Sequence, residues 1–216
     1  MHAQSTDSLV LALHYQNENC HPQGRIKVGV GAREQAWRSE MLAAARRLLD
    51  GARSYGVPII HVRLAVRPDY RDVIQNGPLF RQWVELNAWQ EGTWGVAFHD
   101  GLGPVGAELV VTHIRNNPFF GSPLETLVAM QRPRRLICAG VSTAYAVEST
   151  VRHASDLGYE VVVAADACST ATRARHESAL NAMALIATIS TVDAIVQCFA
   201  ASAGSPTGRA AAPAPG

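Results

Sequence analysis

Six short apolar runs, separated by segments with helical spacing, constrain the fold of this chain more than any other feature of its sequence. A short apolar run bounded by turn residues is typical of a buried strand, whereas apolar residues at every third or fourth position indicate a helix. The runs lie at residues 8–13, 57–64, 108–113, 136–139, 159–164 and 189–192, and the helical segments at 33–55, 124–130, 146–157 and 173–187. Strands that alternate with helices favour a mostly parallel sheet covered on both faces. We therefore expect a single-domain, three-layer α/β/α fold of Rossmann-like type with a six-stranded sheet.

The chain is long enough for one large domain with a continuous core, because it has 216 residues of which 48% are hydrophobic. We place the α/β domain at residues 1–199 and predict a disordered tail at 200–216, where Ala, Pro and Gly dominate. Residues 65–105 are rich in Pro and Gly and indicate a long connection with one short helix near 79–83. Long connections of this kind usually carry function.

Charge and cysteine usage exclude several classes of partner. The 19 Lys and Arg residues nearly balance the 18 Asp and Glu residues, so neither nucleic acid nor an anionic membrane is an expected partner. The four cysteines form no CxxC pair, and no signal peptide or membrane-spanning apolar stretch is evident. We therefore expect a cytoplasmic protein that acts on a small molecule.

The segment Gly140–Thr150 predicts a sharp turn, or elbow, from a strand into a helix. Gly140 allows the backbone to turn, and Ser142 or Thr143 is suited to cap the helix that follows. Backbone N–H groups at such a helix start can hold an anion or a developing oxyanion. Enzymes place Ser or Cys at this kind of turn, but the matching position holds Ala146, whose methyl group cannot act as a nucleophile.

Two histidines occupy the ends of other strands. His14 follows the first apolar run, His113 closes the third, and the elbow follows the fourth. In parallel α/β sheets, ligands bind beyond the carboxyl ends of the strands. We therefore expect His14, His113 and Ala146 to converge on one crevice.

Short motifs that recur in one protein family are spread over residues 8–196. They comprise Leu13-His14-Tyr15-Gln16-Asn17, the loop at 20–24, Glu91 to Gly95, Thr112-His113 through Gly121, the elbow, Asp166-Ala167-Cys168 and His176-Glu177. Together they resemble the isochorismatase-like superfamily, the cysteine hydrolases that include nicotinamidases, N-carbamoylsarcosine amidohydrolases and isochorismatases. The resemblance implies the α/β fold, a homo-oligomer (dimer or tetramer), and a cis peptide between Val141 and Ser142.

The same resemblance implies which groups would react. Members that cleave amides or ureides use an Asp, a Lys and a Cys, whereas this chain has His14, His113 and Ala146 at those positions. True isochorismatases also lack the Cys, but they keep the acid. The chain therefore resembles a divergent member, in which we expect the thioester route to be closed.

Three functions remain open. The first is an enzyme that acts on a small organic carbonyl, amide or enol-ether compound without a thiol, one neutral imidazole accepting a proton and a protonated one donating. The second is a catalytically dead pseudoenzyme that binds a metabolite or supports a partner protein. The third is a metal-dependent hydrolase, in which His14 and His113 bind Zn²⁺ or another divalent ion with a third ligand from His99, Asp100 or Glu91. No other cofactor is indicated.

Several polar and aromatic side chains near these motifs are candidate substrate contacts. They are Gln16, Asn17, Trp94, Asn117, Phe119, Ser142 and Tyr145. The amides are suited to carbonyl or carboxylate groups, and Trp94 and Phe119 to the faces of a flat substrate. His61 lies within a strand and is expected in the core, while Cys168 is the thiol nearest the crevice.

Overall fold

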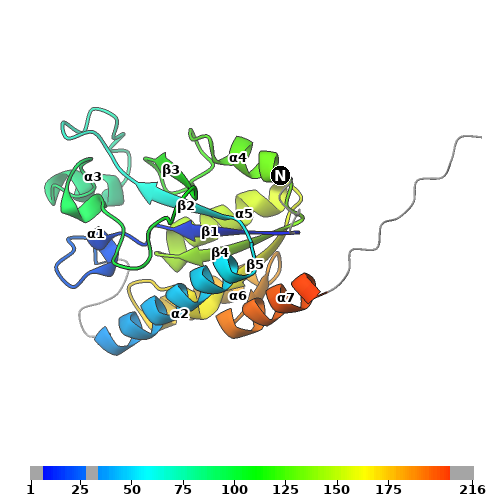
Figure 1. Ribbon diagram of the computed structural model, residues 1–216. Helices are drawn as coiled ribbons and strands as arrows, with labels where there is room; N and C mark the ends of the chain where they lie inside the picture. The colour runs from blue at the N-terminus through cyan, green and yellow to red at the C-terminus, as the bar shows by residue number, and fades with distance from the viewer. Residues whose placement is uncertain (1–6, 28–33, 205–216) are drawn as a thin grey trace, which may run out of the picture.

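Six parallel strands form one sheet in the computed structural model, which describes residues 7–27 and 34–204 (Figure 1). The strands are β1 (Ser8–Leu13), β2 (Ile59–Leu64), β3 (Leu109–His113), β4 (Arg135–Gly140), β5 (Glu160–Ala164) and β6 (Thr188–Ser190). Their order is β3-β2-β1-β4-β5-β6, and all neighbouring pairs are parallel, which confirms the predicted fold class. The predicted helix start at residue 33 and the part of the predicted tail at 205–216 lie outside the described residues.

Helices cover both faces of the sheet and complete the three layers (Figure 1). They are α1 (Asn17–Cys20), α2 (Gln35–Ser54), α3 (Pro78–Glu85), α4 (Leu124–Gln131), α5 (Glu148–Asp156), α6 (Arg173–Met183) and α7 (Val192–Gly204). Helices α2 and α7 lie on one face, and α4 and α5 lie on the other. Within the described part of the chain, no helix has the length and apolarity needed to cross a membrane.

The central strand β1 is apolar along its length because both of its faces are buried. Helix α2 packs on the sheet through buried residues at helical spacing, such as Met41, Ala45 and Leu48. Helix α2 also approaches α7 closely at Gly51, where an added Cβ would lie 2.6 Å from Val196 Cγ2. This contact explains a glycine in a helix interior, where it costs about 1 kcal/mol relative to alanine.

The C-terminal part differs from the sequence-based expectation. Helix α6 ends at Met183, earlier than predicted, and Val192 begins α7 instead of closing the last strand. Helix α7 was not predicted, and it continues to Gly204, past the domain boundary placed at residue 199. Its Ala- and Ser-rich end suggested a tail, but Ile195 and Phe199 are buried in the core, and this packing stabilises the helix.

The long connection between β2 and β3 folds into a second, smaller apolar cluster. Phe80 and Trp83 of α3 pack there with Trp89 and with Leu64 at the end of β2. Helix α3, which carries part of this cluster, lies beyond the carboxyl ends of β1 and β2 (Figure 1). It adjoins the point where β1 has β2 on one side and β4 on the other, and ligands of open α/β sheets bind at such a switch point.

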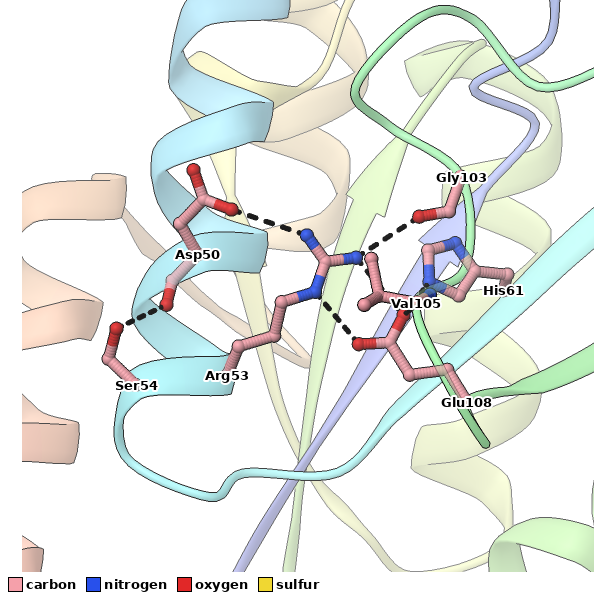
Figure 2. A network of polar contacts seen from close by, with 7 residues as sticks. All are labelled: Asp50, Arg53, Ser54, His61, Gly103, Val105 and Glu108. Carbon is pink, nitrogen blue, oxygen red and sulfur yellow. Dashed lines mark hydrogen bonds and ion pairs between the residues drawn. The ribbon is translucent and has the colours of Figure 1, made fainter.

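Glu108, at the end of this connection, is hydrogen-bonded to Arg53 of α2 (Figure 2). Glu108 accepts hydrogen bonds from Arg53 Nε at 2.8 Å and from the Val105 N–H at 2.9 Å, and it lies 2.8 Å from His61 Nε2. Burial alone would raise the pKa of Glu108, but these hydrogen bonds outweigh it and lower the pKa to about 2. His61 is fully buried, which confirms it as a core residue.

We expect Glu108→Gln to lower the free energy of unfolding by about 2–3 kcal/mol at pH 7, because Arg53 and His61 lose their charged partner. Glu40→Gln is the matched control, since Glu40 forms an exposed ion pair with Arg173 at 3.4 Å. That control should change stability by less than about 0.5 kcal/mol. Urea unfolding followed by circular dichroism measures both variants, and equal losses would contradict the role given to Glu108.

Candidate functional site

A small cavity of about 40 Å³ lies at the switch point, beyond the carboxyl ends of β1 and β4. Its lining includes His14, Asn19, Trp89, Ser142, Tyr145 and Ala146. The structure therefore brings His14 and Ala146 to one pocket, as predicted, with room for a group of only a few atoms. A larger groove of about 560 Å³ lies beside β6 and α7, but it contains none of the residues that the motifs singled out.

His14 and His113 are in contact although their strands are not neighbours. Strand β2 separates β1 from β3, yet the two imidazole rings meet, with their centroids 4.7 Å apart and only 17° between their planes. Their Nε2 atoms are 2.5 Å apart, closer than in an ordinary hydrogen bond, so one ring donates an N–H to the other. Both side chains are buried, and of the two only His14 lines the cavity.

The direction of the pKa shift of His14 favours one arrangement of protons in the pair. His14 makes a second hydrogen bond to the backbone of Val141, and this bond favours the protonated ring, as a bond to a carbonyl oxygen does. His14 thus donates through Nδ1 and accepts through Nε2, so the Nε2–H of His113 is the donor within the pair. His113 Nδ1 is then an acceptor, and it has no hydrogen-bond partner in the described part of the chain.

Burial lowers the pKa of both histidines. It lowers the pKa of His14 to about 4, although the hydrogen bond to Val141 acts in the opposite direction. The pKa of His113 lies well below its usual value because of burial and of the adjacent His14. The lowered pKa values favour a neutral pair at pH 7, whereas the sequence-based expectation was that one imidazole is protonated. A proton that enters the pair is stabilised on His14 by Val141.

Two residues that line the cavity have a left-handed backbone. The φ angle is +54° at His14 and +65° at Trp89. This conformation is uncommon for residues other than glycine, and it persists where the surrounding structure imposes it, often at functional sites. At Trp89 the C=O accepts a hydrogen bond from Val66 N–H at 2.9 Å, and the N–H lies 3.4 Å from Glu18 Oε2.

The elbow lies against the end of β1. An added Cβ at Gly140 would be only 2.1 Å from the carbonyl oxygen of Leu13, so the strand end requires glycine. The Val141–Ser142 peptide is cis, as the family resemblance implies. The helix begins with a π-helical turn that contains Ala146, whose side chain is 4% exposed.

The hydroxyl groups of the elbow do not cap its helix as predicted. Ser142 Oγ lies 2.6 Å from Thr170 Oγ1, and Thr143 Oγ1 lies 2.8 Å from His176 Nδ1. These bonds join the elbow to the segment after β5 and to α6. The backbone N–H of Thr143 donates to Ser169 O, so this donor is not available to an anion.

We expected Gln16 and Asn17 to contact substrate, but their side chains are hydrogen-bonded to backbone groups of the protein. Gln16 Nε2 donates to Leu64 O at 2.9 Å and to Val96 O at 2.8 Å, and its Oε1 accepts from Leu64 N–H at 2.8 Å. Asn17 Nδ2 donates to Trp94 O at 3.1 Å. Neither residue lines the cavity, and both hold the β2–β3 connection against the end of β1.

The other predicted contacts divide into two groups. Ser142 and Tyr145 line the cavity. Trp94, Asn117 and Phe119 do not: Trp94 is 51% exposed, and Asn117 Nδ2 and the ring of Phe119 both contact His153 of α5, so these two support the elbow helix.

Asn19 and Trp89 line the cavity, but they were not among the site residues predicted from the sequence. Asn19 follows the first-strand motif within α1, and Trp89 lies in the long connection, close before the Glu91–Gly95 motif. The position of Asn19 on the same short helix as Asn17 was an available signal. No strand-end rule points to Trp89, because its place depends on tertiary packing.

No cysteine of the described residues lines the cavity, and of the suggested metal ligands only His14 does so. Burial raises the pKa of Cys20 and of Cys168 to about 12, so neither thiol is a ready nucleophile. The suggested third metal ligands bond elsewhere, His99 to Asn17, Asp100 to Arg46 and Glu91 to Arg63. Among residues 7–27 and 34–204, no three metal-binding side chains are grouped to hold an ion. These residues therefore give no support to the metal-dependent alternative.

Comparison with known proteins matches the architecture to a family. Residues 8–194 match the isochorismatase domain family. The chain is 28% identical over 145 residues to the uncharacterized isochorismatase family protein YecD of Escherichia coli O157:H7, covering 66% of this chain and 73% of YecD. It is 30% identical over 177 residues to ureidoacrylate amidohydrolase RutB of Stutzerimonas stutzeri strain A1501, covering 74% and 71% of the two chains. The crystal structure of a cysteine hydrolase from Pseudomonas syringae pv. phaseolicola 1448A has the same fold, with a TM-score of 0.80, 19% identity, and coverage of 91% of this chain and 93% of that one.

The low pKa of His14 predicts that the protein loses stability as the pH falls. The folded state resists protonation of His14 down to about pH 4, whereas the unfolded chain takes up the proton near pH 6.5. The loss therefore occurs between pH 6.5 and 4 and amounts to about 3 kcal/mol. His14→Asn, which tolerates the left-handed backbone, should remove this part of the pH dependence. Urea unfolding at pH 7 and pH 4 measures both proteins, and parallel losses in wild type and variant would refute the assignment.

Proposed function

This chain belongs to the isochorismatase family, and we propose that it is a hydrolase of small amides whose acid–base group is the pair of His14 and His113. The observation that carries the proposal is the 2.5 Å contact between the two Nε2 atoms beside the cavity that Ala146 lines. With alanine at the nucleophile position, water is the attacking group. The 30% identical relative supports the amide class, because its name describes an amidohydrolase.

The neutral state of the pair favours amides over enol ethers. Hydrolysis of an enol ether begins with protonation of the substrate, which needs an acid that holds a proton at the working pH. With the pKa of His14 lowered to about 4, the pair holds no such proton at pH 7. Amide hydrolysis by water begins instead with removal of a proton, which a neutral imidazole performs.

The imidazole pair accepts one proton from the water and returns it to the leaving group. The water oxygen bonds to the carbonyl carbon while a proton of the water passes to the pair, where His14 carries the charge and Val141 stabilises it. A protonated ring of such low pKa is a strong acid, so it returns the proton to the leaving nitrogen as the C–N bond breaks. The products are a carboxylic acid and an amine or ammonia, and the pair is again neutral.

A binding protein without catalysis is the second candidate. One observation favours it: both ring nitrogens of His14 are already bonded within the protein, to Val141 and to His113. A catalytic cycle must open one of these bonds, whereas a binding function need not. Turnover therefore decides between the two functions.

We expect His14→Asn and His113→Asn each to lower kcat/KM for a small amide or ureide by roughly 10²–10⁴-fold, the usual contribution of acid–base catalysis. The control is His21→Asn, since His21 does not line the cavity and its ring lies against the exposed Trp94, and it should stay within about twofold of wild type. In the wild type, kcat/KM should be level at neutral pH and fall as His14 is protonated near pH 4. Release of ammonia or amine gives the rate. If no small amide or ureide is hydrolysed, while a ligand raises the Tm of the protein, the result would favour the function of a binding protein.

Alkylation tests the absence of a thiol nucleophile. Cys20, Cys138 and Cys168 are buried and Cys198 is exposed, so iodoacetamide should modify Cys198 alone and leave the rate unchanged. Mass spectrometry locates the modified residue, and Cys198→Ser provides the unreactive control. Activity that disappears with alkylation of a buried cysteine would contradict the proposed mechanism.

A further inference from the structure

Two buried polar atoms in residues that line the cavity lack a hydrogen-bond partner within residues 7–27 and 34–204. They are the amide oxygen of Asn19, an acceptor, and the indole Nε1–H of Trp89, a donor. The two residues are 4% and 3% exposed. Buried polar groups in folded proteins are almost always hydrogen-bonded, so such atoms at one cavity call for an explanation.

The fold does not require the polarity of either side chain. The backbone of Asn19 is held by its N–H, which donates to Gln16 O at 3.3 Å. The backbone of Trp89 is held by Val66, and its ring packs edge-on against Trp83. Apolar side chains of similar size would satisfy the same packing without burying unpaired polar atoms.

The two atoms are complementary to a group that has one donor and one acceptor. A carbonyl oxygen accepts from Trp89 Nε1–H, and an N–H donates to Asn19 Oδ1. A carboxylate would set an oxygen against the Asn19 oxygen, and an ammonium group would set its hydrogens against the indole N–H. Unpaired polar groups of this kind give strong discrimination between isosteric ligands.

We infer that Asn19 and Trp89 are the specificity-determining residues of the site and that they bind an uncharged amide or ureide group. The inference rests on the proposed function, and it names the residues that select the substrate. The cavity of about 40 Å³ suits such a group, and His14 and Ala146 line the same cavity. The amide is thereby held beside the imidazole pair.

Binding of acetamide tests the inference without reference to turnover. In a ¹⁵N–¹H spectrum of the full-length protein, the Trp89 indole signal is assigned by its absence in Trp89→Phe. Acetamide should shift this signal with a Kd in the millimolar range, as expected of so small a ligand, whereas acetate and methylammonium at equal ionic strength should not. Equal shifts with acetamide and acetate would overturn the inference.

Substitutions identify the residues that recognise the amide. Binding to the variants is followed by the backbone N–H signal of Ala146, which also lines the cavity and is kept in every variant. Asn19→Leu and Trp89→Phe should each weaken acetamide binding at least tenfold, while Trp94→Phe, the same change at an exposed tryptophan outside the cavity, should leave it within twofold. If Asn19→Leu does not fold, the inference is tested by comparing acetamide binding in Trp89→Phe and in Trp94→Phe. Unchanged binding in Trp89→Phe would overturn the inference.

The two proposals fail in different ways. Acetamide binding that depends on Asn19 and Trp89, with no hydrolysis of any amide, supports the inference and contradicts the hydrolase function. Hydrolysis with a KM that is unchanged in Asn19→Leu and Trp89→Phe supports the hydrolase function and overturns the inference.

Discussion

The close approach of Gly140 to Leu13 positions the groups of the site. Strands β1 and β4 pair in parallel with Leu13 beside Gly140, and a side chain at Gly140 would collide with the Leu13 carbonyl oxygen. The next residue on each strand is therefore His14 or Val141, and these two share the hydrogen bond that orients the imidazole. Any displacement of β4 from β1 would separate His14 from Val141 and from the elbow that carries Ala146.

The imidazole pair also avoids the free-energy cost of burying two charged groups at the site. The acid and the amine that the family resemblance implies at these two positions would form an ion pair, and removing two charges from water is costly. Two imidazoles that share one hydrogen carry no net charge, so their burial costs far less. The same burial lowers the pKa of both rings. The pair thus gains stability in its neutral form at the expense of basicity.

Sequence patterns were sufficient for the parts of the molecule that depend on local periodicity or on strand ends. They located the six strands. They also predicted that His14 and Ala146 share one cavity, because parallel strands end at the same edge of a sheet. They failed where tertiary contacts decide. We expected Gln16 to contact substrate, but its side-chain amide is hydrogen-bonded to the backbone of Leu64 at the end of β2 and of Val96 in the β2–β3 connection. Trp89 reaches the cavity through a left-handed turn that no local pattern encodes.

The positive φ angle of His14 limits how this site can change during evolution. Asn, Asp and His tolerate the left-handed region better than other residues with side chains, whereas β-branched residues are strongly disfavoured there. Position 14 can therefore exchange an acid, an amide and an imidazole while the backbone stays in place. A different reaction requires no new fold, but the reactive groups available to the first strand end are restricted to this small set by its backbone geometry.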